Sequence, residues 1–239
     1  MQSFSLDKLA LGVLWYLVFV FSTVVHEAAH ALAAKMGGDD TAFRGGQVTL
    51  DPMPHIRREP FGMVLVPLLT YFMGGWMMGW ASAPYNPQWA NRYPRRAAWM
   101  SLAGPGANLS LVIIAGVSIR IGILLNIFQP PSRISFTNLV AAAPGQAQFI
   151  SVLAMFVSIT FMLNLILGFF NLMPVPPLDG STGITLFMNR DLMNRWYQLT
   201  RQPLVALIGF IFIWRVFGSI LAPILSMALK VLYPDIAYR

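Results

Sequence analysis

The chain has 239 residues, of which 56% are hydrophobic and only 10% are charged, and it contains no cysteine. Because soluble domains usually carry about 25% charged residues, this composition predicts a membrane protein with several spans. The lack of cysteine excludes disulfides and thiolate metal sites. The net charge of +7 is explained by basic loops that face the cytoplasm and anionic lipid, and we expect no nucleic acid as partner.

The first expected span, residues 9–35, ends in the sequence HEAAH at positions 26–30. Positions i and i+4 of a helix lie on one face, one turn apart, so the two imidazoles can hold one metal ion together. Glu27 then lies where it can reach a water on that metal. By itself the pattern is a weak signal, because three defined letters also occur by chance in unrelated proteins.

Residues 39–55 are polar, and we expect a small β-hairpin there, near the candidate metal site, with extended segments at 41–43 and 47–50. The free edge of such a hairpin can bind an extended peptide, but an ordinary connecting loop is an equally good interpretation. For His55 we favour a loop or supporting role over metal binding, because it has no fixed spacing to the other two histidines.

Residues 61–81 are apolar but broken by one proline and several glycines. The segments before and after them are both basic, so the positive-inside rule places both flanks in the cytoplasm. We therefore expect this piece to dip into the membrane and return, or to pack without crossing it. Irregular backbone at that depth is tolerated only where protein or a water-filled cavity covers it.

The second expected span, residues 97–128, contains the sequence AGPGAN at positions 103–108. Its glycines and alanines permit close approach of a neighbouring helix. Asn108 carries a polar side chain into the bundle, either as an interhelical hydrogen-bonding group or as a donor to an oxyanion. The connection at 129–146 has a single basic residue, Arg133, which fits the outer face of the membrane.

The third expected span, residues 149–172, runs into the sequence NLMPVPPLDG at positions 171–180. Its three prolines cannot continue a helix, so they hold an extended segment that places Asp179 rigidly. A lone aspartate in a loop is usually a turn or cap residue. Asp179, however, follows a membrane helix on the face that carries the HEAAH sequence, which makes it the best candidate for a third metal ligand.

Residues 182–202 are amphipathic and are expected to be cytoplasmic, and a last span follows at 203–232. Pro223 is expected to kink this span. Either the whole segment crosses the membrane once, or its last part lies in the interface.

Taken together and in this order, the HExxH, AGPGAN and NLMPVPPLDG sequences resemble those of the site-2 protease family of intramembrane zinc metalloproteases, over residues 25–180. The chain is most similar to compact bacterial members without a PDZ or CBS domain. The resemblance implies an all-α polytopic membrane protein with about four transmembrane helices. It also implies one membrane-embedded peptidase domain at 1–239, with a core at 9–180 and a C-terminal amphipathic segment and last span at 181–239.

The same resemblance implies one Zn²⁺ per chain, bound by His26, His30 and Asp179, with Glu27 as the general base and Asn108 as support for the tetrahedral intermediate. The implied reaction is hydrolysis of peptide bonds within or near the transmembrane segments of membrane-anchored proteins. The expected partners are such substrates and the lipid bilayer, and the expected location is the inner or plasma membrane, with the site toward the cytoplasm. The oligomeric state stays open.

Two alternatives remain at this stage. A metal-binding channel or transporter would need ionisable residues along several spans, whereas here they cluster at one face, apart from Arg120 and Arg215. A catalytically inactive scaffold that binds membrane proteins is disfavoured by the intact HExxH sequence, although only an assay separates it from an enzyme.

Overall fold

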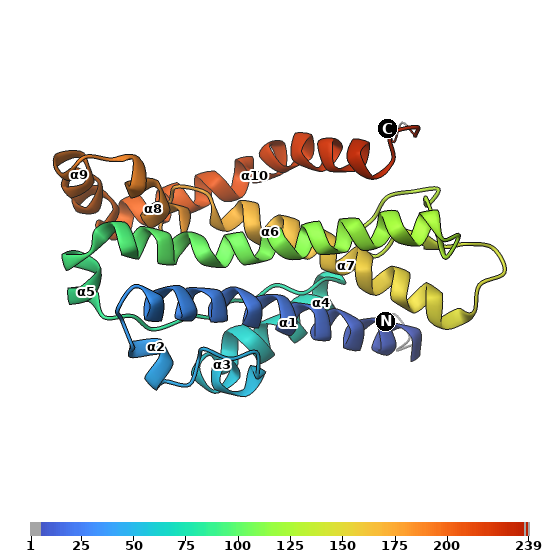
Figure 1. Cartoon of the computed structure of the whole chain (residues 1–239), viewed down its shortest axis with the longest axis horizontal. Coiled ribbons are helices and arrows are strands. Elements are labelled where there is room, and N and C mark those ends of the chain that lie inside the picture. The colour runs from blue at the N-terminus through green and yellow to red at the C-terminus, as the bar shows by residue number, and fades with distance from the viewer. Residues whose placement is uncertain (1–5, 237, 239) are drawn as a thin grey trace.

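The structure is a computed structural model that describes residues 6–236 and residue 238. Helices make up most of it (Figure 1). Four of them are long and apolar enough to cross a membrane: α1 (Leu6–Met36), α6 (Pro94–Leu124), α7 (Gln148–Asn171) and α10 (Pro203–Leu232). The four expected spans are thereby confirmed, with ends shifted by only a few residues.

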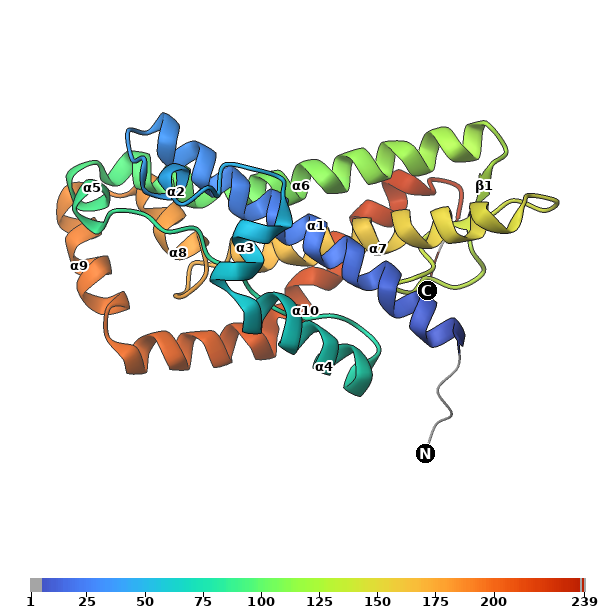
Figure 2. The ribbon, with the colours of Figure 1, turned by 90° about the horizontal axis from the view of Figure 1, so that it is seen from below.

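Helices α1, α6 and α7 pack against one another and form the body of the molecule (Figure 1). Their contact surfaces include buried aromatic side chains such as Trp15 and Phe19 on α1. Helix α10 lies on the outside of this group and bends midway along its length, with Pro223 inside it (Figure 2). Among its described residues only Ile213 and Leu232 are buried.

The segment at 61–81 turns back on itself, as expected. A π-helical turn, η1 (Phe61–Leu65), continues into α4 (Val66–Gly74), and Gly75 ends this helix with a left-handed conformation. At about 1.5 Å per residue the pair is roughly 21 Å long, too short for a hydrocarbon core of about 30 Å. The returning chain lies directly against η1, where the Trp80 amide donates to the Gly62 carbonyl at 3.2 Å.

The expected hairpin within residues 39–55 was wrong. The segment instead forms two short helices, α2 (Thr41–Arg44) and α3 (Pro52–Arg58), joined by a loop. Helix α3 begins with a strong local signal: the Asp51 side chain accepts from the Met53 amide at 2.9 Å, and a proline occupies the first turn. At the start of α2 the Asp39 side chain accepts from the Thr41 amide at 3.0 Å, so local hydrogen bonds outweigh the weak alternation that suggested strands.

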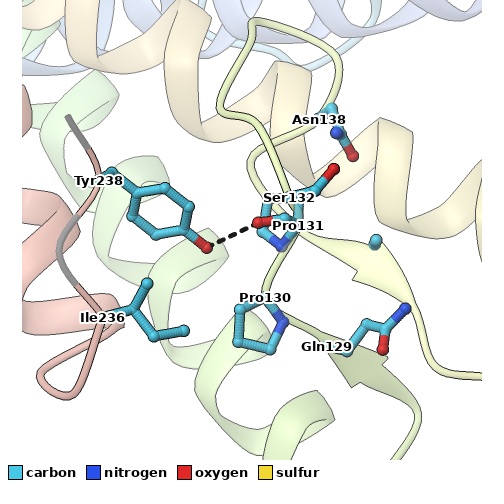
Figure 3. A pocket seen from close by; sticks show the side chains of 8 residues that line it. Gln129, Pro130, Pro131, Ser132, Asn138, Ile236 and Tyr238 are labelled. Atoms are coloured by element: carbon cyan, nitrogen blue, oxygen red, sulfur yellow. Dashed lines mark hydrogen bonds between the residues drawn. The ribbon is translucent and has the colours of Figure 1, made fainter.

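The small hairpin of this chain lies instead in the connection between α6 and α7. It consists of β1 (Phe128–Gln129) and β2 (Ala141–Ala142), which pair antiparallel. Beside it, the C-terminal segment and this connection line an open pocket of about 610 Å³, where the Tyr238 hydroxyl donates to the Pro131 carbonyl at 2.9 Å (Figure 3). The three histidines of the chain do not line this pocket.

Beyond α7 the chain forms two short turns, α8 (Gly180–Gly183) and η2 (Ile184–Phe187), and then the amphipathic helix α9 (Arg190–Thr200). Helix α9 has no buried residue and lies at the same end of the molecule as α2 and α5 (Pro87–Arg92) (Figure 1). The C-terminal end of α1 is fixed at this end too, because Trp89 and Arg96 both donate to the Gly37 carbonyl at 3.0 Å.

Candidate metal centre

Helix α1 places His26 and His30 one turn apart on the face that packs against α6. Their Nε2 atoms are 3.0 Å apart, and the two rings meet edge to face at 82°. Both histidines are 7% exposed, and Glu27, between them in sequence, is 6% exposed. Three ionisable side chains therefore lie almost out of contact with solvent on one helix. Because burying such groups costs free energy, the arrangement indicates a functional site.

Asp179 reaches these histidines from the loop that follows α7. Its Oδ2 atom lies 3.1 Å from the His26 Nε2 atom and 3.3 Å from the His30 Nε2 atom. The loop folds tightly on itself: a Cβ at Gly180 would overlap the Leu172 carbonyl, so the position requires glycine. The Ser101 hydroxyl on α6 also donates to the Asp179 carbonyl at 2.7 Å and anchors the loop to the bundle.

The hydrogen bonds of the other ring nitrogens determine what the Nε2 atoms can do. The His30 Nδ1 atom lies 2.7 Å from the Met100 carbonyl, which can only accept, so Nδ1 carries the proton. The His26 Nδ1 atom likewise lies 2.5 Å from the Asn108 Oδ1 atom. In the neutral imidazole each Nε2 atom therefore keeps a free lone pair, which is the form in which histidine binds metals.

Two lone pairs and a carboxylate oxygen that face one another repel unless a cation lies between them. Tetrahedral zinc with bonds of about 2.0–2.1 Å needs donor atoms roughly 3.3–3.4 Å apart. The three donor atoms here are separated by 3.0, 3.1 and 3.3 Å. His26, His30 and Asp179 are the group of potential ligands that converges in the described part of the chain, and their geometry fits one zinc ion. His55, buried on α3, is not part of this group, and its Nε2 atom donates to the Thr49 carbonyl.

Asp179 lies outside the spans, and its charge is set by this environment. Burial by itself raises the pKa of the Asp179 carboxyl, but the positive charge and hydrogen bonds of His30 and His26 in their protonated form outweigh that effect, so the pKa lies below its ordinary value. A bound cation in the same place would act in the same direction. The carboxylate is therefore ionised at neutral pH, as a metal ligand must be.

Gly104 explains why α6 can approach the histidines so closely. A Cβ at this position would overlap the His30 Nε2 atom and would lie 2.6 Å from the His26 Nε2 atom, in the space that the metal needs. Gly106, two residues later, faces open space. The AGPGAN sequence predicted a close helix contact, but it did not identify which glycine faces the site.

Asn108 is fully buried, and both ends of its amide have protein partners. Oδ1 faces His26, and Nδ2 donates to the Asn164 Oδ1 atom on α7 at 2.7 Å. Its expected contribution to an oxyanion stays a prediction. Sequence reasoning did not select Asn164, although a buried amide in the middle of an apolar span is itself an indication of function.

Comparison with known proteins agrees with this site. The family model described as "Peptidase family M50" matches residues 14–216 of the chain. YwhC of Bacillus subtilis, named as a candidate zinc metalloprotease, is 35% identical over 173 residues, which cover 71% of this chain and 68% of YwhC. The similarly named Rip2 of Mycolicibacterium smegmatis is 24% identical over 173 residues, 72% of this chain and 56% of that protein.

Rip2 of Mycobacterium tuberculosis is 29% identical over 167 residues, which cover 70% of this chain. The match includes only 54% of that protein, so the chain corresponds to little more than half of the mycobacterial relatives. No solved structure matches the chain.

Proposed function

Because this chain belongs to peptidase family M50, a family of zinc metalloproteases with membrane-spanning helices, we propose that it is an intramembrane endopeptidase. Its reaction is hydrolysis of peptide bonds within or near the transmembrane segments of membrane-anchored proteins. The observation that carries the proposal is the convergence of His26, His30 and Asp179, with Glu27 beside them, among helices of membrane-spanning length.

His26, His30 and Asp179 would hold the zinc ion, which when bound would lower the pKa of a water molecule toward about 7 and so supply the nucleophile. Glu27 follows His26 directly on α1 and takes the proton from the attacking water. The same carboxyl group then passes the proton to the leaving amine. The low exposure of Glu27 limits competing water around the carboxylate, which strengthens its interaction with the reacting groups.

Water and substrate reach the site from the side of Asp179. The Asp179 side chain is 22% exposed, whereas the imidazoles are 9% exposed. A helical substrate keeps its carbonyls in its own hydrogen bonds, so it has to unwind before attack. Substrates with glycine, proline or asparagine near the cleaved bond are therefore preferred, because these residues weaken the helix.

We place the site end of the molecule in the cytoplasm, and the protein in the plasma membrane. The supporting observation is that the segments at this end carry most of the basic residues. They are Lys35, Arg44, Arg57, Arg58, Arg92, Arg95, Arg96, Arg190, Arg195 and Arg201. The connection at the opposite end carries only Arg133 among residues 125–147.

The direct test is Glu27→Gln in detergent-solubilised protein with a membrane-spanning test substrate. The variant retains all three metal ligands, so its zinc content should equal that of the wild type, while cleavage should fall by about 100-fold or more. Glu59→Gln is the matched control, because it makes the same change in the chain's other glutamate, which accepts a hydrogen bond from Ser82 away from the metal. Full cleavage by Glu27→Gln would end the proposal. If Glu27→Gln still carried metal ions into liposomes, that result would favour a transporter.

A further inference from the structure

The two histidine ligands are braced in different ways. His30 donates to a main-chain carbonyl, that of Met100, which cannot change its polarity. His26 faces the side chain of Asn108, and an amide side chain can present either its oxygen or its nitrogen. Only the oxygen keeps the proton on Nδ1 of His26 and leaves the lone pair on Nε2. The metal-binding form of His26 therefore depends on the direction of the Asn108 amide.

Asn164 sets that direction. One end of its amide lies 2.8 Å from the Thr160 carbonyl, an obligatory acceptor, so this end must be the NH₂ group. The other end, Oδ1, faces Asn108 at 2.7 Å and can only accept. Asn108 must therefore present its NH₂ group to Asn164, where it also lies 3.4 Å from the Ser22 carbonyl, and its oxygen to His26.

This chain of hydrogen bonds is isolated from water. Ser22, Asn108 and Asn164 each have 0% exposure, and the Asn164 NH₂ group also donates to the Ser22 hydroxyl at 2.8 Å. Reversing either amide would set two oxygens or two NH₂ groups against each other, with no solvent to relieve the conflict. The Thr160 carbonyl on α7 thus fixes the direction of the Asn164 amide, and through it that of the Asn108 amide, which determines the ring nitrogen of His26 that carries the proton.

We propose that Asn164 is a positioning residue for metal binding, which acts through Asn108 to hold His26 with its proton on Nδ1 and its Nε2 lone pair directed at the zinc. The inference rests on the metal centre of the proposed function. It assigns to α7 a role in the site that neither the motifs nor the ligand set contains.

The test is zinc affinity, measured on the purified protein in detergent by competition with a chromophoric chelator. Asn164→Leu removes both hydrogen-bonding ends and frees Asn108 to turn. The loss of a group that orients a metal ligand typically lowers affinity by roughly 10- to 100-fold, which is the result expected here. Asn164→Ala, which leaves room for a water, serves if the leucine variant does not fold, with a loss of about fivefold or more expected.

A second substitution separates positioning from simple packing. Asn108→Asp in the Asn164→Leu background offers an oxygen to His26 whichever way the carboxylate turns, so it should restore most of the lost zinc affinity. Cobalt substitution of the same variants reports the ligand environment independently of activity. Wild-type affinity in Asn164→Leu, or a loss that Asn108→Asp does not repair, would overturn the inference.

Ser158→Ala is the matched control on the same helix. Ser158 is also fully buried, but its hydroxyl accepts from the Leu139 and Val140 amides in the connection between α6 and α7. We expect a lower unfolding temperature with unchanged zinc affinity. An equal loss of zinc affinity in this control would show that destabilisation alone explains Asn164→Leu and would refute the positioning role. Wild-type protein that binds no zinc would instead refute the metal centre itself.

Discussion

Helices α7 and α10 are almost equally apolar, yet they occupy opposite environments. Their most apolar 18-residue windows have mean hydropathies of 2.4 and 2.3, but 61% of the α7 window is buried and only 6% of the α10 window. Both helices satisfy the same rule for crossing a membrane, so that rule says nothing about which of them packs against protein.

The difference lies in their polar side chains. Helix α7 carries Ser158, Thr160 and Asn164, all buried and all hydrogen-bonded within the protein. On α10, Ser219 and Ser226 are exposed. Polar groups inside a bilayer are favourable where protein satisfies them, and the three on α7 are all buried where this helix packs on its neighbours.

The largest effect is expected on α6, which presents one face to α1 and the other to the exterior. Gly104→Ala fills the space next to the two Nε2 atoms, so zinc affinity should fall by about 100-fold or more and activity should be lost. Gly106→Ala makes the same change two residues away, where nothing lies within 4 Å, and should bind zinc normally. Zinc content of the two purified variants checks this, and equal values would break the comparison between buried and exposed faces.

A medium effect should distinguish α7 from α10 directly. A Cβ at Gly168 on α7 would lie 2.9 Å from the Leu109 Cδ2 atom, so Gly168→Ala should destabilise the protein by about 1–3 kcal/mol through overpacking. Gly218→Ala on α10 meets nothing within 4 Å and should be neutral, or stabilising by up to about 1 kcal/mol through helix propensity. Denaturation in detergent measures both, and a Gly218→Ala variant that is the less stable of the two would contradict the placement of α10.

The smallest effect extends the comparison beyond the membrane, to the adjacent aspartates 39 and 40. Asp39 is buried, and although burial raises the pKa of its carboxyl, hydrogen bonds from Thr41 and from the Asn86 amide lower it below its ordinary value of 3.8. Its contribution to stability is therefore complete above the ordinary pKa and is lost as the pH falls through the lower, folded-state pKa.

Asp39→Asn should accordingly remove about 1 kcal/mol of stability at neutral pH. It should also make the unfolding temperature fall less steeply as the pH is lowered, which is the acid limb of its pH dependence. Asp40 is exposed, so Asp40→Asn should leave the pH dependence as it is in the wild type. Thermal unfolding measured between pH 3 and pH 7 tests both variants, and an unchanged acid limb in Asp39→Asn would show that the Asp39 hydrogen bonds add no stability.

The spans and the candidate metal site at His26, His30 and Asp179 could be predicted because each depends on a strong local signal: long apolar runs, a helical i, i+4 pair, and an aspartate held by prolines. The expected strands at 41–43 and 47–50 failed because alternation over so few residues is a weak signal. Residues 41–44 form α2, before which the Asp39 carboxylate accepts from the Thr41 amide, and 47–50 belong to the loop before α3. Gly104 could not be selected, because its role depends on which neighbouring helix it faces, and that is decided by packing. An amide within an apolar span could have drawn attention to Asn164, but its partners could not be predicted from the sequence.

The absence of a side chain at Gly104 also has a consequence for the direction of approach. With the α6 backbone pressed against both imidazoles, that side of the centre is a wall. In the proposed reaction, a scissile carbonyl would have to approach from a side that the α6 backbone does not cover. Residue 104 thus limits the directions from which a substrate would reach the centre, because any side chain there would overlap the two imidazoles.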